Sequence, residues 1–280
     1  MSAPEVAFVL PAGGSTGAVQ VGILHALAER AIVPDVVVGC SVGALNATFF
    51  ALEPGVEQAR QLARVWQMLS RRDVFGPVGL RTLARVIGRR PHIYDPKPLR
   101  SLIRSLIPVE DLADVPVPAH VVTTDLDVGL ARWWTTGPVD ELLYASACLP
   151  GLFPPSVIDG HRHVDGGVLE PVPIARAVDT DASVIYVLGQ TFGPGDAAPR
   201  MGALHVLLRS FGISRYAGLP DPASLAHVGQ RVIVVPGAPV AGLDITDFSQ
   251  SDRLIRDSTA RAHRFLDGLD VSSAASHLMV

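Results

Sequence analysis

The chain has 280 residues, of which 48% are hydrophobic and 18% are charged, and its formal net charge is −4. This length and apolar content are enough for one large α/β domain, or two small ones, with a sizeable core. The absence of a basic excess argues against a nucleic-acid-binding protein, so we expect no nucleic acid among its partners.

The first predicted elements alternate between strand and helix. The wholly apolar run 6–10 predicts a strand buried on both faces, and the glycine-rich turn 13–17 leads into a helix over 18–30. A second apolar strand over 35–38 is followed by a helix over 42–52. This order is typical of a parallel sheet with helices packed against it.

The middle of the chain contains further helix and strand patterns. Residues 56–70 carry large apolar side chains at positions i, i+3, i+4 and i+7, which predicts an amphipathic helix. Further helices are expected over 80–88, 98–106 and 139–147, and strands over 119–125, 130–135, 183–188 and 231–235.

The C-terminal part of the chain is predicted to be helical. Residues 201–216 have leucines and a phenylalanine at helical spacing, and they form either a cap over a lipid-binding cleft or an ordinary surface helix. A terminal amphipathic helix is expected over 251–269, and residues 271–280 are expected to form a flexible tail. Because no repeat or linker interrupts the chain, we predict a single domain over residues 1–270.

Cysteine content and hydropathy indicate the cellular compartment in which the protein is expected. Cys40 and Cys148 are too few for a disulfide framework and are expected to be buried thiols in a reducing environment. The N-terminus lacks the pattern of a signal peptide. The longest uncharged run, 36–52, falls short of the roughly 20 apolar residues of a membrane-spanning helix. We therefore expect a cytoplasmic protein that contacts membranes only peripherally, at their surface.

The stretch Gly39-Cys40-Ser41-Val42-Gly43 is the clearest chemical signal in the sequence. It lies between a predicted strand and a predicted helix, so Ser41 occupies a sharp turn that forces its hydroxyl outward. The start of the following helix also presents free N–H groups to a developing negative charge. These features predict that Ser41 is a nucleophile.

A serine nucleophile needs a base, and Asp165 is the best-placed candidate. Its turn, Asp165-Gly166-Gly167, follows the short strand 162–164. Loops after the strands of a parallel sheet collect at one edge, so this turn is expected to meet the turn that holds Ser41. Burial would raise the pKa of the carboxyl and make it a better proton acceptor. The amides of Gly13 and Gly14 could then hold the oxyanion.

Four motifs, over residues 10–18, 39–47, 145–155 and 164–168, occur in this order and together resemble the patatin-like phospholipases. The resemblance covers about residues 5–190. It implies a single-domain, three-layer α/β sandwich with a mainly parallel central sheet. It also implies a Ser–Asp dyad, without histidine, metal or organic cofactor, that acts on acyl esters of lipids.

Matching the motifs residue by residue assigns the roles that the resemblance implies. Ser41 is the nucleophile and Asp165 the proton acceptor, while Gly13 and Gly14 form the oxyanion loop. The supporting glycines of the turns are Gly17, Gly39, Gly43, Gly166 and Gly167. Residues 150–155 match the apolar stretch that lines the family's active-site region. A lipid or fatty-acyl ester is thus the expected partner, with peripheral membrane contact.

Three positions depart from the family pattern. Ala12 stands where the family has a first glycine, Thr16 where it has Lys or Arg, and Glu170 where it often has Asn. Because a positive charge near the oxyanion loop is missing, we expect weaker binding of a phosphate headgroup and a preference for neutral or small esters.

The sequence also offers features of other classes of site. The glycine-rich turn lacks the first glycine and the following acidic residue of a dinucleotide site. His161 and His163 match no usual zinc spacing and are expected to lie at the rim or surface. An α/β-hydrolase esterase whose Ser-Asp-His triad uses His227 or His263 stays open as an alternative, as does a lipid-binding or regulatory protein without catalysis.

Overall fold

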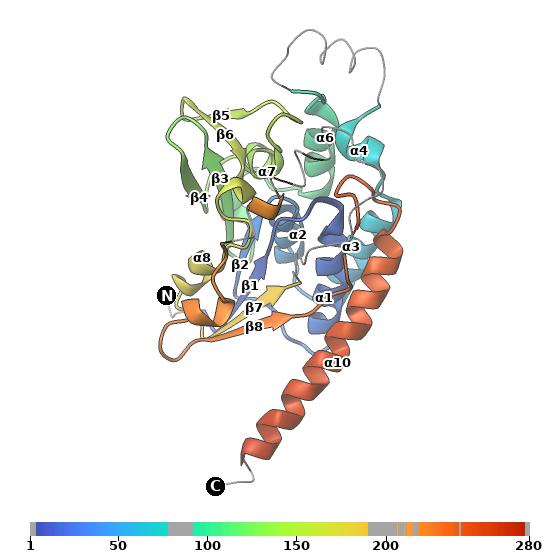
Figure 1. Cartoon of the computed structure of the whole chain (residues 1–280), viewed down its shortest axis with the longest axis vertical. Helices are drawn as coiled ribbons and strands as arrows, with labels where there is room; N and C mark the ends of the chain where they lie inside the picture. Colours follow the sequence, from blue (N-terminus) through green and yellow to red (C-terminus); the bar gives the residue numbers. More distant parts are fainter. Residues whose placement is uncertain are drawn as a thin grey trace.

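The computed structural model describes residues 4–77, 92–189, 218–240 and 242–277, together with residues 206, 210 and 212–214. Its centre is a mixed eight-stranded sheet with the order β5-β6-β3-β2-β1-β7-β8, and β4 pairs with β3 beside this path (Figure 1). The parallel strands are β1 (Val6–Leu10), β2 (Val36–Cys40), β3 (Ala119–Asp125), β7 (Val184–Leu188) and β8 (Arg231–Val235). The antiparallel strands are β4 (Leu130–Trp134), β5 (Ser156–Ile158) and β6 (His161–Asp165).

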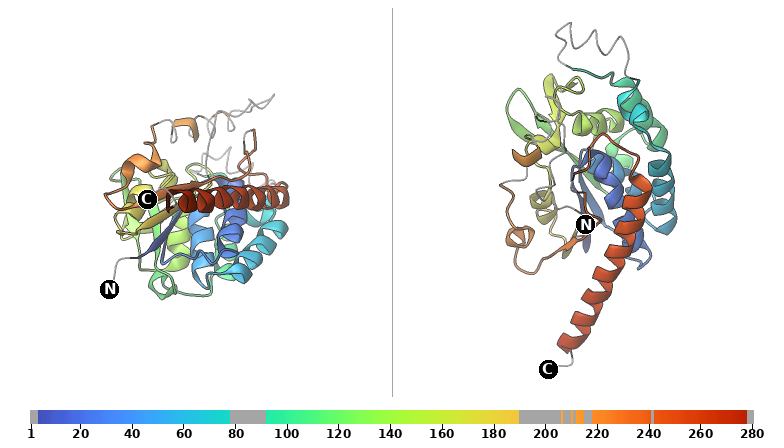
Figure 2. Two further views of the ribbon diagram at one scale, coloured as in Figure 1. Left: turned by 90° about the horizontal axis from the view of Figure 1, so that it is seen from below. Right: turned by 45° about the vertical axis from the view of Figure 1, so that its right-hand side comes forward.

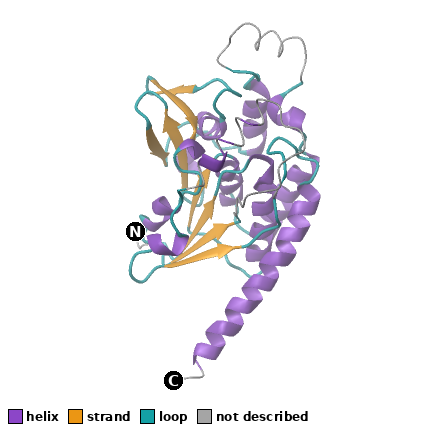
Figure 3. Cartoon of the chain, viewed as in Figure 1, coloured by secondary structure: helices purple, strands orange, loops and turns teal. Residues whose placement is uncertain are grey.

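Helices cover both faces of this sheet, which gives three layers (Figure 3). The larger layer contains α1 (Ala18–Ala28), α2 (Val42–Ala51), α3 (Val56–Met68), α4 (Arg71–Phe75), α6 (Lys97–Leu106), α7 (Val139–Ala147) and α10 (Ser251–His277). The smaller layer contains α8 (Ile174–Val178), and the short helix η4 (Pro222–Leu225) lies near it. The remaining 3-10 helices are η1 (Gly14–Gly17), η2 (Leu112–Asp114) and η3 (Gly166–Val168). The predicted α/β class with a mainly parallel central sheet is confirmed.

Strand β1 shows why a continuous apolar run predicted a central strand. Phe8 and Leu10 belong to the core beneath the larger helical layer, whereas Ala7 and Val9 belong to the core beneath α8. Because side chains alternate between the faces of a strand, each face of β1 must be apolar. All four residues have no exposed surface.

The last helix, α10, packs along α1 and is longer than predicted. The Thr259 hydroxyl donates to the Gly22 carbonyl at 3.0 Å, and a Cβ on Gly22 would lie 2.3 Å from the Ile255 carbonyl oxygen. The helix continues to His277, because the sequence after Leu269 holds no proline or glycine to end it. Most of the segment predicted as a tail is therefore helical, and Figure 2 shows this end projecting beyond the other helices.

Two predicted segments fall outside the described residues. They are the helix expected over 80–88 and most of the segment 201–216, which is predicted to be either a cap or a surface helix. The two cysteines, in contrast, are well placed: both thiols are free and buried, as expected. Burial, together with the nearby Asp165 carboxylate, raises the pKa of Cys148 to about 12, so this thiol stays protonated at neutral pH.

One buried histidine predicts how stability depends on pH. The Arg176 guanidinium donates to Nδ1 of His120 at 2.9 Å, and burial, reinforced by this cation, lowers the pKa of His120 to about 4. As the pH falls, the imidazole of residue 120 is protonated near pH 6.5 in the unfolded chain but only near pH 4 in the folded protein. The free energy of unfolding is therefore highest above pH 6.5 and decreases as the pH drops toward 4.

We expect the loss between pH 7 and pH 5 to be on the order of 1 kcal/mol, after a discount for partial solvent exposure. Urea unfolding at both pH values should show a smaller loss for His120→Asn than for the unmodified chain. An equal loss in both proteins would contradict this origin.

Candidate active site

The turn between β2 and α2 holds Ser41 in an unusual backbone conformation. Its φ is 56° and its ψ is −128°, in a region that L-residues other than glycine rarely adopt. Strain of this kind costs on the order of 1–3 kcal/mol and clusters at functional sites. Here it directs the Ser41 hydroxyl toward Asp165.

Ser41 and Asp165 are in direct contact in the interior of the protein. Oγ of Ser41 donates a hydrogen bond to Oδ2 of Asp165 at 2.6 Å. Ser41 is 6% exposed and Asp165 is fully buried. Oδ1 of Asp165 accepts the Gly167 N–H at 2.8 Å, so one carboxylate oxygen is oriented by the backbone while the other faces the serine.

Asp165 reaches the serine by a different route from the one expected. It ends β6, which runs antiparallel to β3, rather than lying in a loop after a parallel strand. The register pairs Asp165 with Thr123, and Cys40 with the preceding residue of β3, Val122. Because β6 and β2 flank β3, they lie roughly 10 Å apart, and their shared level on β3 lets the Asp165 and Ser41 side chains meet across this distance.

The glycine-rich loop after β1 borders the same site. Gly14 has a φ of +58°, and together with Ser41 it lines one cavity. Ser15 N–H donates to the Ile245 carbonyl, which fixes the loop against the segment before α10. Within the part of the chain that the structure describes, the amides of Gly13 and Gly14 donate no hydrogen bond to another residue.

Close backbone contacts explain the supporting glycines. A Cβ on Gly43 would lie 2.0 Å from the Leu10 carbonyl oxygen, and one on Gly166 would lie 2.4 Å from the Val122 carbonyl oxygen. Any side chain there would push the turn that holds Ser41 away from β1, or Asp165 away from β3. Gly17 and Gly39 are similarly crowded, by Val42 and by Ala44.

A buried polar network that the sequence did not predict supports the glycine-rich loop. The Asn46 amide donates to the Gly17 carbonyl at 3.1 Å and to Oε1 of Gln20 at 2.9 Å. Its oxygen accepts Nε1–H of Trp66 at 2.9 Å, while Gln20 donates to the Pro11 carbonyl at 2.6 Å. The network therefore holds both ends of the loop. Its only sequence signal is an amide side chain in a largely apolar helix.

Ser146 is a second residue that sequence reasoning missed. Its Oγ accepts the Ser41 N–H at 2.9 Å, and it is fully buried in α7. Ser146 thereby fixes the backbone of the turn that holds Ser41. Ser146 lies in the motif 145–155, but its partner is 105 residues away, so the motif did not reveal this hydrogen bond.

An apolar cavity of about 90 Å³ opens beside Ser41. Phe153 lines it and stacks on Phe75 with ring centroids 5.5 Å apart, as expected for the segment 150–155. Its walls come from α2, α3, α4, α6 and α7 and from the loop before α10, and they include Leu45, Leu62, Trp66, Leu99, Ile103, Leu149 and Phe248. A space of this chemistry suits an alkyl chain.

The positions that depart from the family pattern serve the loop or lie partly buried. Thr16 is 7% exposed, and its hydroxyl donates to the Gly13 carbonyl at 2.9 Å. It therefore stabilises the loop as a neutral residue and brings no charge. Burial raises the pKa of the Glu170 carboxyl. The backbone N–H of Glu170 donates to the Gly166 carbonyl.

The histidines that could serve as metal ligands or as a third catalytic residue contact residues other than Ser41 and Asp165. His263 contacts Glu29 and Arg30 at the end of α1, and His227 lies in the turn that precedes β8. His163 is buried, with Nδ1 3.0 Å from the Thr123 hydroxyl, which corrects the expectation of a surface residue.

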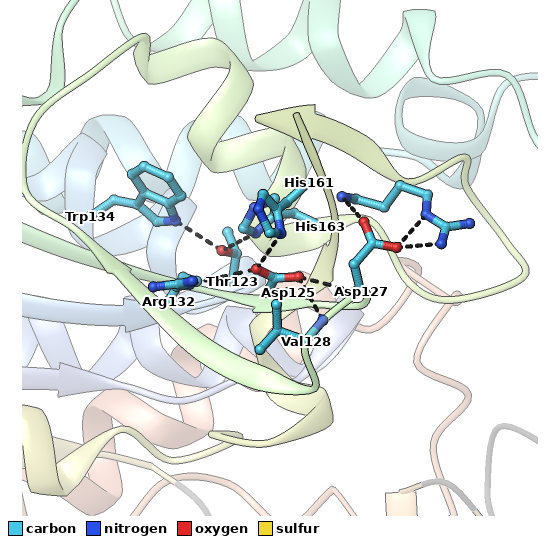
Figure 4. A network of polar contacts seen from close by, with 9 residues as sticks. Thr123, Asp125, Asp127, Val128, Arg132, Trp134, His161 and His163 are labelled. Atoms are coloured by element: carbon cyan, nitrogen blue, oxygen red, sulfur yellow. Dashed lines mark hydrogen bonds and ion pairs between the residues drawn. The ribbon is translucent and has the colours of Figure 1, made fainter. Parts of the chain in front are cut away.

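His161 lies near two carboxylates, which the sequence did not suggest (Figure 4). Its Nδ1 is 3.1 Å from Oδ2 of Asp125. Arg132 also pairs with Asp125, and Arg162 pairs with Asp127, so cations of the chain already neutralise both carboxylates. This cluster is therefore an ion-pair network that links the β3–β4 hairpin to β6.

Comparison with known proteins identifies the family. A family model described as patatin-like phospholipase matches residues 8–178. The chain belongs to the patatin-like phospholipase family. Its segment with Ser41 and its segment with Asp165 both fall within the matched range. No helix among the described residues of this patatin-like protein is both long and apolar enough to cross a bilayer.

The relatives of this patatin-like phospholipase differ from it in length. An uncharacterized NTE family protein of Mycobacterium tuberculosis is 31% identical over 218 residues, covering 75% of this chain and 57% of that protein. Patatin-like phospholipase domain-containing protein 7 of Rattus norvegicus is 31% identical over 185 residues, which cover 65% of this chain and 13% of that protein. The chain thus spans little more than half of the first and a small part of the second.

A solved structure shares the fold of this patatin-like chain. VipD from Legionella pneumophila superimposes with a TM-score of 0.50 at 14% sequence identity. The match covers 95% of this chain and 67% of VipD. At this level of identity the likeness concerns the fold alone.

Proposed function

We propose that this protein is a serine hydrolase that cleaves acyl esters of lipids. The observation that carries the proposal is the 2.6 Å hydrogen bond between Ser41 and the buried Asp165 carboxylate, beside an apolar cavity. A serine hydroxyl becomes a competent nucleophile when an adjacent base takes its proton. Membership of the patatin-like phospholipase family supports the same assignment.

The proposed reaction proceeds through an acyl-enzyme. Oγ of Ser41 attacks the ester carbonyl while Asp165 accepts the hydroxyl proton, and the negative charge on the carbonyl oxygen is held by the amides of Gly13 and Gly14. Asp165 then returns the proton to the departing alkoxide, and the C–O bond of the ester breaks. Asp165 then takes a proton from water, and the resulting hydroxide attacks the carbonyl of the acyl-serine. The bond between this carbonyl carbon and Oγ of Ser41 breaks, Asp165 returns the proton to Oγ, and the fatty acid leaves.

The cavity beside Ser41 suggests how the acyl chain is bound. A cavity of about 150 Å³ accepts benzene, so about 90 Å³ holds roughly four carbon atoms of an acyl chain. Thr16 brings no charge to the glycine-rich loop, which favours esters whose alcohol part is neutral. We therefore expect neutral acyl esters to be better substrates than anionic phospholipids.

Nitrophenyl esters of increasing acyl length test the proposal directly. Each methylene buried in the cavity contributes about 0.8 kcal/mol, so kcat/KM should rise roughly fourfold per carbon from acetyl to pentanoyl, and more slowly beyond. Steady-state hydrolysis measures this series, with Ser41→Ala as the baseline. Turnover that Ser41→Ala retains would overturn the assignment.

A fluorophosphonate probe distinguishes the hydrolase from a lipid-binding protein without catalysis. The probe reacts with an activated serine, and mass spectrometry of the tryptic peptides locates it. We expect labelling at Ser41 in the folded protein and none after Ser41→Ala. Absence of labelling in folded, unmodified protein would favour the non-catalytic alternative.

A further inference from the structure

The turn of the β3–β4 hairpin carries exposed large apolar residues close together in sequence. Leu126 is 51% exposed, Val128 is 50% exposed and Leu130 is 55% exposed. Exposed apolar residues that occur singly need no explanation, but a cluster on a projecting element marks an interaction surface. We call these three residues the hairpin tip.

The hairpin tip lies at the same edge of the sheet as Ser41 and Asp165. Asp165 pairs with Thr123 on β3, and the tip begins at Leu126, three residues farther along the chain and directly after the end of β3. At about 3.3 Å per residue, the tip stands roughly 10 Å beyond the level of the Ser–Asp pair. Leu169, four residues after Asp165, is also exposed, by 46%.

Hydrogen bonds hold the hairpin tip in a fixed shape (Figure 4). Oδ1 of the buried Asp125 accepts the N–H groups of Asp127 at 3.0 Å and Val128 at 3.1 Å. The Gly129 N–H donates to the Asp125 carbonyl at 2.8 Å, and Asp127 binds both the backbone and the guanidinium of Arg162. A surface that is ordered in advance loses little conformational entropy when it binds.

The charges around the hairpin tip identify the kind of surface it fits. Arg132 pairs with Asp125 and Arg162 pairs with Asp127, so the four charges of the network cancel. Without a net positive charge, attraction to anionic headgroups is weak. Apolar side chains, in contrast, partition into the interface of any bilayer.

We propose that the hairpin tip inserts into the surface of a neutral lipid aggregate and so places the site with Ser41 against its substrate. The proposal rests on the proposed lipid acyl hydrolase function, since that site acts on molecules that reside in such aggregates. It assigns to the β3–β4 hairpin an interfacial role that is separate from the chemistry. The contact is apolar, so it should depend little on ionic strength.

Sedimentation with phosphatidylcholine vesicles tests the proposal. All proteins carry Ser41→Ala to prevent hydrolysis. We expect Leu126→Ser with Val128→Ser to weaken vesicle binding roughly tenfold, since two half-exposed side chains lose their apolar contact. The matched control is Val33→Ser with Val228→Ser, two exposed valines that precede β2 and β8 at the opposite edge of the sheet. This control should bind as the parent protein does, at low and at high salt.

The outcomes separate this proposal from the proposed function. In the background that retains Ser41, the hairpin variant should hydrolyse a soluble short-chain ester at the normal rate. Vesicle binding that is unchanged in the hairpin variant, or lost equally in the control, overturns the docking proposal while leaving the hydrolase intact. A change of oligomeric state in the hairpin variant, measured by analytical ultracentrifugation, would instead assign the tip to a second copy of the chain and also overturn it.

Discussion

Asp165→Asn is expected to lower kcat on a soluble short-chain ester by on the order of 10²–10⁴-fold, with little change in KM. Asparagine has nearly the same shape and can still accept the Gly167 N–H that orients the residue. It cannot accept the proton of Ser41, however, and its NH₂ group would face the Ser41 oxygen as a competing donor. Steady-state kinetics at neutral pH measure the loss, and thermal unfolding confirms that the variant is folded.

Histidine variants provide the counterpart to this experiment. His227→Ala and His263→Ala should each leave kcat within about twofold of the unmodified protein, because their side chains lie at the turn before β8 and against α1. A large loss in either variant, combined with substantial turnover by Asp165→Asn, would favour a triad that uses histidine. The two sets of variants thus distinguish the Ser–Asp pair from the α/β-hydrolase arrangement.

Asn46→Leu is expected to destabilise the protein by about 3 kcal/mol or more and to lower kcat/KM. Leucine matches asparagine in size, but it leaves the Trp66 N–H, the Gln20 oxygen and the Gly17 carbonyl without their partner in a buried region. Each unsatisfied buried group costs about 1–3 kcal/mol. Urea unfolding measures the stability, and ester hydrolysis reports whether the glycine-rich loop keeps its position.

Thr48 provides a matched control on the same helix. It is fully buried in α2, and its hydroxyl has no hydrogen-bond partner among the residues that the structure describes. Thr48→Val replaces that hydroxyl with a methyl group of similar size, so the free energy of unfolding should change by less than about 1 kcal/mol. A loss as large as that of Asn46→Leu would show that α2 tolerates no substitution, and the role of the Asn46 network would then be unsupported.

The parts of the fold that the sequence predicted well are those with strong local patterns. The short apolar runs of β1 and β2 require burial on both faces, and the Gly-x-Ser-x-Gly turn between β2 and α2 needs its glycines for close backbone contacts. Such constraints act within a few residues. They can therefore be recognised without knowing how distant segments pair.

The parts that were missed depend on strand pairing and on long-range partners. The sequence placed Asp165 after a short strand, but it did not reveal that β6 runs antiparallel to β3 and is in register with Thr123. Ser146 and the partners of Asn46 were missed for the same reason, because a hydrogen bond between distant segments leaves no periodic trace. The length of α10 was underestimated because the end of a helix without proline or glycine has no clear local signal.

The antiparallel pairing of β6 with β3 has a consequence for the synthesis of the protein. The proposed base, Asp165, follows the proposed nucleophile, Ser41, by 124 residues, and it meets the serine only after β3 and β6 have joined the sheet. A nascent chain that has emerged as far as α2 already displays the hydroxyl, yet no carboxylate is present to activate it. The proposed lipid cleavage is thereby withheld on the ribosome until most of the central sheet has assembled.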